Sequence, residues 1–203
     1  MSQFNLKTGD ILLFDYEGGG LFGWFTSAIK YFTNSKYSHV AMVLKDPEFI
    51  HPSLKGYYIW ESSWEGKPDP QDNKIKLGVQ ITPFDEIYNH YKLKNSKIVL
   101  RRINNNEYFT NDKLETIHKG VYDKPYDIIP RDWLDEIFHK DAHPQKTDRF
   151  WCSALIGYIY TKCNILNNET DWSSLRASDF SEKYKNNLQF INNHNLLKEE
   201  KIL

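Results

Sequence analysis

The chain has 203 residues, which suits a single domain spanning residues 1–203 that is long enough to bury a sizeable core. Hydrophobic residues make up 40% and charged residues 26%, the composition of an ordinary globular protein. The formal net charge is −1 and no run of Lys or Arg exceeds two residues, which argues against a nucleic-acid partner.

The two cysteines and the N-terminus indicate a reducing compartment. If one helix carries Cys152 and Cys163, they lie about 16 Å apart at ~1.5 Å per residue, whereas a disulfide needs Cα atoms within about 7 Å. The polar N-terminus lacks the apolar region of a signal peptide, and the longest apolar-leaning stretch, residues 21–32, is too short to span a membrane. We expect a cytoplasmic protein, or one in a host cytosol or virion if the source is a virus.

The N-terminal half reads as one helix among strands. Short apolar, β-branched or aromatic runs bounded by turn residues predict strands that pair in an antiparallel sheet. Apolar residues at three- and four-residue steps predict an amphipathic helix. The expected strands are 10–14, 39–44, 57–61, 79–82 and 97–103, and the expected helix is 21–32.

The C-terminal half reads as helical. A first helix is capped by Asn111 or Asp112 and runs to Gly120, a second spans 131–140, and a third, capped by Thr147 or Asp148, spans 149–162. Residues 188–191 are expected to return as a strand, and about 192–203 to form a loose polar tail or a terminal helix. Strands followed by helices predict an α+β fold, with an antiparallel sheet or partial barrel packed against helices.

Cys152 lies in the most informative segment, Phe150-Trp151-Cys152-Ser153-Ala154, in the first turns of the third helix. The positive end of the helix dipole favours a thiolate, the form of cysteine that attacks carbonyl groups. The alternative is a small buried hydrophobic residue, the usual role of a free cysteine. We expect Cys163, at the far end of the helix, to be such a buried hydrophobic residue.

A cysteine nucleophile needs a base, and His39 is the best of seven histidines because it begins an apolar strand, which fixes an imidazole better than a loop does. The others lie in loops or on polar helix faces. His139 and His143, four residues apart, are a conceivable metal pair, but no third ligand or Glu of the metalloprotease motif accompanies them. We expect no metal.

Glu61 is the candidate for the group that orients the imidazole. It follows apolar residues in the expected strand 57–61, where a carboxylate without a partner is costly, and neighbouring strands can bring it beside His39. The alternative is a surface glutamate at the end of the strand.

These residues resemble the circularly permuted papain-like hydrolases of the NlpC superfamily, which include bacterial YiiX-like proteins, poxvirus and giant-virus proteins, and lecithin:retinol acyltransferase. In this branch the histidine strand precedes the cysteine helix, as His39 precedes Cys152 here. The resemblance covers roughly residues 8 to 182. Similar segments in the same order are Gly9-Asp10-Ile11-Leu12, Ser38-His39-Val40, Trp60-Glu61-Ser62, Gly78-Val79, Lys124-Pro125-Tyr126-Asp127, Trp151-Cys152-Ser153 and Ala177-Ser178-Asp179-Phe180.

The resemblance implies a cysteine hydrolase without a cofactor, in which Cys152, His39 and Glu61 are catalytic. It makes Tyr126 a candidate oxyanion donor beside the backbone N–H of Cys152, although the 26-residue gap between them exceeds that of unpermuted members. A buried tyrosine that anchors a turn is the alternative. Ser38 and Ser153, which flank the two reactive residues, are further candidates for substrate binding.

The expected activity is cleavage of an amide or ester through a thioester, on a small peptide, another amide or a lipid acyl group. Rival interpretations are a lipid acyltransferase or phospholipase that uses the same residues, a non-catalytic binding module, and a metal-binding protein. The aromatic helix 21–32 gives a possible transient contact with a membrane surface, although a role in the core is the simpler reading.

Overall fold

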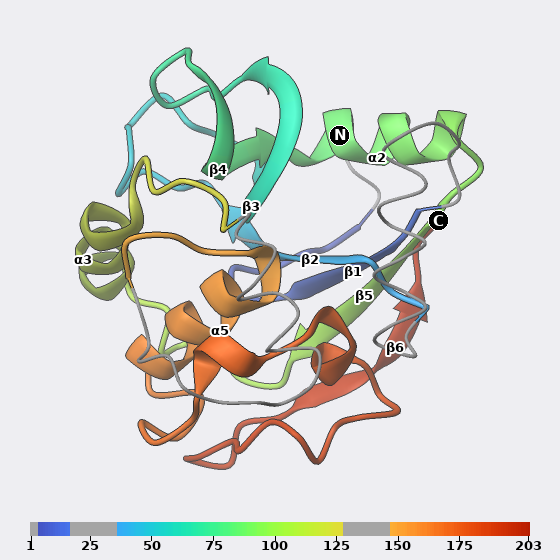
Figure 1. The fold of residues 1–203 in the computed structure, drawn as a ribbon, viewed down its shortest axis with the longest axis vertical. Coiled ribbons are helices and arrows are strands. Elements are labelled where there is room, and N and C mark those ends of the chain that lie inside the picture. The colour runs from blue at the N-terminus through green and yellow to red at the C-terminus, as the bar shows by residue number, and fades with distance from the viewer. Residues whose placement is uncertain (1–3, 17–35, 128–146) are drawn as a thin grey trace.

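The computed structural model describes residues 4–16, 36–127 and 147–203, and these form an α+β fold around a six-stranded sheet (Figure 1). All neighbouring strands pair antiparallel, in the order β4-β3-β2-β1-β5-β6. The strands are β1 (Ile11–Asp15), β2 (His39–Lys45), β3 (Tyr57–Pro68), β4 (Ile75–Pro83), β5 (Lys97–Ile103) and β6 (Leu196–Lys201). The helices are α2 (Phe84–Leu93), α3 (Asn111–Val121) and α5 (Cys152–Lys162), with the 3₁₀ turns η1 (Trp172–Ser174) and η2 (Ala177–Phe180).

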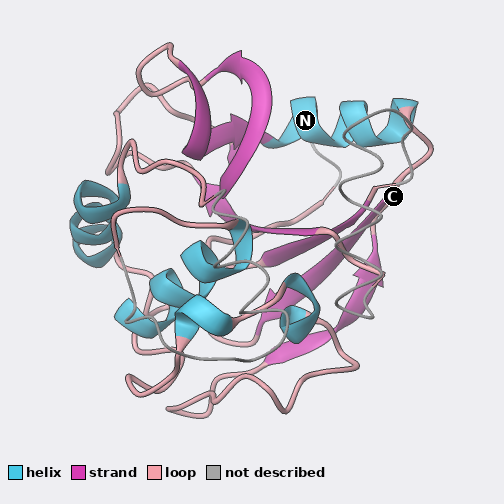
Figure 2. Cartoon of the chain, viewed as in Figure 1, coloured by secondary structure: helices cyan, strands magenta, loops and turns pink. Residues whose placement is uncertain are grey.

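Alternation along the strands divides the buried residues into two cores, one on each face of the sheet. Val40, Met42 and Trp60 belong to the larger core, which also contains the apolar residues of α5 and α3. Ala41 and Val43 belong to the smaller core, which is covered by α2. Helices therefore cover both faces of the sheet, and their arrangement can be followed in Figure 2.

The expected strands of the N-terminal half are present, but two are longer than predicted. β3 continues to Pro68 and β4 begins at Ile75, so the hairpin extends well beyond the apolar runs that indicated it. The added part contains a register shift between Trp64 and Pro68, and Gly66 there has φ +66°. A bulge of this kind interrupts the alternation of apolar and polar residues that marks a strand in the sequence.

Both described C-terminal helices begin elsewhere than expected. α3 is capped by the Thr110 side chain, which accepts from the amide of Lys113. α5 begins at Cys152, not at residue 149, because the backbone of Phe150 is engaged with the segment around Tyr126. The Phe150 amide donates to the carbonyl of Pro125, and its carbonyl accepts from the amide of Asp127.

The prediction of a loose tail at 192–203 is wrong, since Leu196–Lys201 forms β6, an edge strand paired with β5. The Arg101 guanidinium adds side-chain hydrogen bonds to the carbonyls of Leu196 and Leu197, at 2.7 and 2.6 Å. The charged residues of this segment suggested an unpaired tail, but charged side chains are common in edge strands. Of the expected strand 188–191, the structure retains an isolated bridge between Phe190 and Leu166.

Helix α2 was not predicted, although its sequence contains a readable pattern. Phe84, Ile87, Tyr88 and Tyr91 recur at helical spacing and pack toward the smaller core. Acidic residues occupy its first turn and basic residues its last, which suits the helix dipole.

The expected helices 21–32 and 131–140 and the His139–His143 pair lie outside the described residues. In the described part of the chain, no helix is both long enough and apolar enough to cross a membrane.

Candidate active site

Cys152 is the first residue of α5 and is 8% exposed. Trp151 is the N-cap residue, and α5 packs against β2 and β3. By helix geometry, the first N–H groups of α5 have no acceptor within the helix, and they place the positive end of its dipole beside the thiol. Backbone amides of Ser153 and Val40 also make hydrogen bonds to the Cys152 sulfur.

His39, the first residue of β2, lies between Cys152 and Glu61. Its Nε2 is 2.7 Å from Oε2 of Glu61, and its side chain is 18% exposed. The ring also makes a side-chain hydrogen bond with Cys152. Since Nε2 donates to the carboxylate, Nδ1 is the nitrogen that remains for the thiol.

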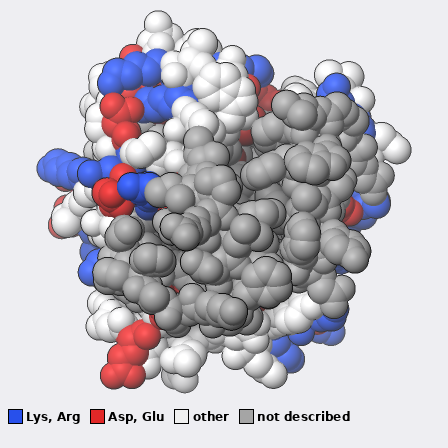
Figure 3. Space-filling model, in the orientation of Figure 1, with Lys and Arg blue, Asp and Glu red and all other residues white. Residues whose placement is uncertain are grey.

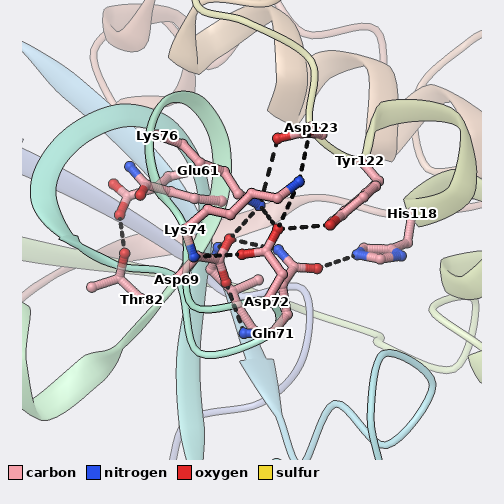
Figure 4. Close-up of polar contacts among 12 residues, drawn as sticks. Glu61, Asp69, Gln71, Asp72, Lys74, Lys76, Thr82, His118, Tyr122 and Asp123 are labelled. Carbon is pink, nitrogen blue, oxygen red and sulfur yellow. Dashed lines mark hydrogen bonds and ion pairs between the residues drawn. The ribbon is translucent and has the colours of Figure 1, made fainter.

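Glu61 is 1% exposed and is held by a second hydrogen bond. Thr82 lies on β4 diagonally across from Glu61, and it donates its hydroxyl to Oε1 of Glu61 at 2.8 Å (Figure 4). The structure therefore brings the three predicted residues together in one chain of hydrogen bonds, Thr82–Glu61–His39–Cys152. Thr82 was not predicted as part of the site, because its strand also contains Gln80 and nothing in the sequence distinguishes the two polar residues.

The pair of Cys152 and His39 stabilises charge on both partners. Burial lowers the pKa of His39, but hydrogen bonds and charges of Cys152 and Glu61 outweigh it and raise the pKa to about 10. Burial raises the pKa of Cys152, but the hydrogen bond and charge of His39 and the two backbone amides lower it overall. The arrangement therefore favours a thiolate–imidazolium pair, and a thiolate is a strong nucleophile.

Cys163, by contrast, is fully buried at the C-terminal end of α5, where burial raises the pKa of its thiol to about 12. Both thiols are free. Cys163 remains a neutral thiol at physiological pH, as expected for a residue with a packing role.

Tyr126 lies in the segment that precedes α5 and forms a bridge with Phe150. Its amide donates to the carbonyl of Leu77 on β4 at 3.1 Å. Burial, followed by the charge of Cys152, raises the pKa of the Tyr126 phenol, so it remains a protonated donor near the thiol. Its role as oxyanion donor stays a prediction.

Gly78 allows the Tyr126 segment to approach β4. Its φ is +150°, and a Cβ atom there would lie 2.3 Å from the carbonyl oxygen of Lys124 and 2.9 Å from the amide of Tyr126. This contact is a physical reason for glycine at the start of Gly78-Val79, one of the motifs used to identify the resemblance.

Ser38 and Ser153 use their hydroxyls within the fold. Ser38 donates to the carbonyl of Phe14 at 3.4 Å, and Ser153 to that of Leu175 at 2.6 Å. These bonds anchor the residues next to His39 and Cys152, while participation of the hydroxyls in substrate binding stays a prediction.

Aromatic side chains form one wall of the site and were not predicted as part of it. The Phe14 ring packs against His39, with centroids 5.3 Å apart, and against Tyr91 of α2 at 4.8 Å. Tyr91 also contacts Tyr16, which follows β1. Burial, followed by the charges of Glu65 and Glu61, raises the pKa of Tyr91, and the charge of Cys152 also acts on it. Tyr91 therefore lies close to both carboxylates and to the thiol.

A second polar cluster ties the β3–β4 hairpin to the end of α3 (Figure 4). The Lys76 ammonium, 7% exposed, contacts Asp69 at 3.0 Å and Asp72 at 2.8 Å. Asp72 also accepts from the Tyr122 hydroxyl at 2.6 Å, and His118 is 2.7 Å from the amide oxygen of Gln71. Both carboxylates are bonded to the Lys76 ammonium within the fold, which indicates a structural role for this cluster.

The described residues offer no group of three His, Cys, Asp or Glu side chains arranged to hold a metal ion. On the face shown in Figure 3, described basic and acidic side chains lie in small groups around the periphery. No protein-family model matches the chain, and no curated protein matches it in sequence.

Proposed function

We propose that this protein is a cysteine hydrolase with a permuted papain-like fold, which cleaves an amide or ester bond through a thioester on Cys152. The observation that carries the proposal is the hydrogen-bonded chain from Thr82 through Glu61 and His39 to a cysteine at the start of a buried helix. A purely structural cysteine has no need of a histidine that is itself oriented by a buried carboxylate.

In the first half-reaction, the Cys152 thiolate attacks the carbonyl carbon and forms a carbon–sulfur bond. The negative charge moves to the carbonyl oxygen, where the backbone N–H of Cys152 and the Tyr126 hydroxyl are the proposed donors. As the tetrahedral intermediate collapses, the imidazolium of His39 donates its proton to the leaving nitrogen or oxygen. The carbon–nitrogen or carbon–oxygen bond breaks, and a thioester remains.

In the second half-reaction, neutral His39 accepts a proton from water while the water oxygen attacks the thioester. Release of the carboxylic acid restores the thiolate and the imidazolium. Glu61 holds Nε2 throughout and stabilises the positive charge on the ring. An alcohol or amine in place of water gives acyl transfer with the same residues, and a peptide, another amide or a lipid acyl group is the proposed substrate.

The proposal is tested by trapping the acyl-enzyme. The protein is incubated with activated acyl esters of different chain length and with amino-acid esters, then quenched in acid and examined by intact-mass spectrometry. We expect an acyl adduct at Cys152 that hydroxylamine removes, and none in Cys152→Ala. An adduct that persists in Cys152→Ala, or the lack of any adduct or turnover with the whole set, would contradict the proposal. Cys163→Ala is the matched control and should acylate normally.

A further inference from the structure

A second carboxylate, Glu65, lies near the catalytic residues without a role in the proposed mechanism. Glu61 and Ser63 lie two residues apart on β3 and share the face of the sheet that α2 covers, and Glu65 follows two residues later, where the register shift begins. The Ser63 hydroxyl donates to Oε1 of Glu65 at 3.1 Å and itself accepts from the amide of Gln80 at 2.9 Å. These bonds direct the Glu65 carboxylate back along the strand toward Ser63.

Glu61 places this part of β3 near the start of β2. Its carboxylate contacts His39 at 2.7 Å, and Ser63 follows Glu61 by two residues on the same strand. The charges of Glu61 and His39 both act on Glu65, in agreement with this placement. Glu65 therefore lies within electrostatic range of the catalytic cluster.

The negative charge of Glu65 is only weakly balanced by the described residues. Its carboxylate accepts a hydrogen bond from the neutral Ser63 hydroxyl, while the ammonium of Lys67 bonds Glu86 at 2.6 Å. Burial and the charge of Glu61 raise the pKa of Glu65 to about 7, against the opposing effects of His39, Ser63 and Lys67. A bound cation would favour the ionised carboxylate and relieve this cost.

Tyr91 lies within electrostatic range of both Glu65 and the thiol. It is half-buried, and the charges of Glu65, Glu61 and Cys152 all act on its hydroxyl. Its ring continues the aromatic wall formed by Phe14 and Tyr16. Aromatic faces attract ammonium groups, and the attraction grows as the cation loses water. A carboxylate beside aromatic rings is a combination that suits an ammonium ligand.

We propose that Glu65, with Tyr91 beside it, binds an ammonium group of the substrate close to the bond that Cys152 attacks. The inference rests on the proposed function and narrows its substrate class to amides or esters that carry a protonated amine or a quaternary ammonium. Glu61 bonds His39 and serves catalysis, whereas Glu65 serves recognition of the substrate.

The test uses thiol reagents that carry a positive charge, no charge or a negative charge, so it does not require the natural substrate. Alkyl methanethiosulfonates react with a thiolate to form a disulfide and release methanesulfinate. The cationic 2-(trimethylammonio)ethyl, the neutral methyl and the anionic 2-sulfonatoethyl reagents are compared on Cys163→Ala protein. The rate at Cys152 is followed by mass spectrometry and divided by the rate for a small thiol.

We expect the cationic reagent to be favoured over the neutral one by about tenfold, the size of the attraction of an ammonium to a nearby carboxylate and an aromatic face. The anionic reagent should be disfavoured. In Glu65→Gln the preference should disappear, whereas Glu115→Gln, which removes an equal charge from an exposed site on α3, should retain it. Since Glu65 becomes protonated below its pKa of about 7, the preference should also weaken at acidic pH, and only when Glu65 is present.

The outcomes separate the two proposals. A Cys152 that reacts no faster than a small thiol contradicts the proposed function and this inference with it. A reactive Cys152 without preference for the cation, or with a preference that survives in Glu65→Gln, overturns the ammonium site alone.

Discussion

Glu61 and Ser62 are neighbours on β3 that point to opposite faces of the sheet and hold the two halves of the reactive pair. Glu61 accepts from His39 at 2.7 Å, whereas Ser62 donates its hydroxyl to the carbonyl of Phe150 at 2.6 Å. Phe150 lies two residues before Cys152. One dipeptide therefore orients the imidazole and fixes the segment that delivers the thiol.

This division predicts different defects for two adjacent substitutions. Glu61→Gln removes the charge beside His39, so the pKa of the imidazole should fall from about 10. Ser62→Ala should leave that pKa nearly unchanged, but should destabilise the fold by about 1–2 kcal/mol through the lost buried hydrogen bond and slow thiol alkylation. NMR titration of His39 and chemical denaturation measure the two effects. Equal shifts of the His39 pKa in both variants would contradict the separation.

Thr82 should act through Glu61. Thr82→Val keeps the shape of the side chain but leaves Oε1 of Glu61 without its hydroxyl donor, so we expect kcat/KM to fall by about five- to tenfold. Thr82→Ser restores the hydroxyl and should recover most of the activity. Measurement of the pH profile adds a test, because a defect in packing alone would not shift the limb governed by His39. Activity in Thr82→Val equal to that in Thr82→Ser would exclude this role.

The pH dependence of the reaction follows from the opposite shifts of the two pKa values. Below the lowered pKa of Cys152 the thiol is protonated, so acylation should fall on the acid side. Above about pH 10 the imidazolium loses its proton and no longer serves the leaving group, so kcat should fall on the alkaline side. Stopped assays across this range should give a broad plateau between the limbs. An acylation rate that begins to rise only near pH 8.5, the ordinary pKa of a thiol, would contradict the thiolate–imidazolium pair.

A comparison of Gly78 with Gly56 tests the close backbone contact between β4 and the segment around Tyr126. Both have positive φ, but a Cβ at Gly78 meets backbone atoms of Lys124, Pro125 and Tyr126, whereas at Gly56 it meets nothing within 4 Å. Gly56→Ala should cost about 1 kcal/mol from backbone strain alone. Gly78→Ala should cost about 1–3 kcal/mol more and reduce activity, because the Tyr126 segment must move. Thermal unfolding and kcat report the two quantities, and equal effects of the two substitutions would contradict this role for Gly78.

The central residues of the site are predictable from the sequence because each is a reactive or charged residue beside an apolar segment. His39 begins an apolar strand, Glu61 ends an apolar run, and Cys152 stands where polar residues give way to a buried helix. The geometry confirms that these three side chains meet. Their shared function remains a proposal.

The supporting residues were not predictable in the same way, because their roles depend on register. Thr82 and Ser62 are unremarkable in sequence, and only the pairing of β3 with β4 and the position of Phe150 give them partners. Tyr91 comes to the site through α2, whose helical spacing was readable but not recognised. The charged strand β6 illustrates the opposite case, in which composition suggests a free tail and backbone pairing overrides it.

The most direct test of the thiolate–imidazolium pair is the rate of Cys152 alkylation by iodoacetamide as a function of pH, in Cys163→Ala protein with and without His39→Ala. With His39 present, we expect rapid, selective modification of Cys152 well below the pKa of an ordinary thiol. In His39→Ala, the rate should follow a pKa near or above 8.5, since burial then acts without its counterion. The same pH profile with and without His39 would show that the two residues do not form a reactive pair.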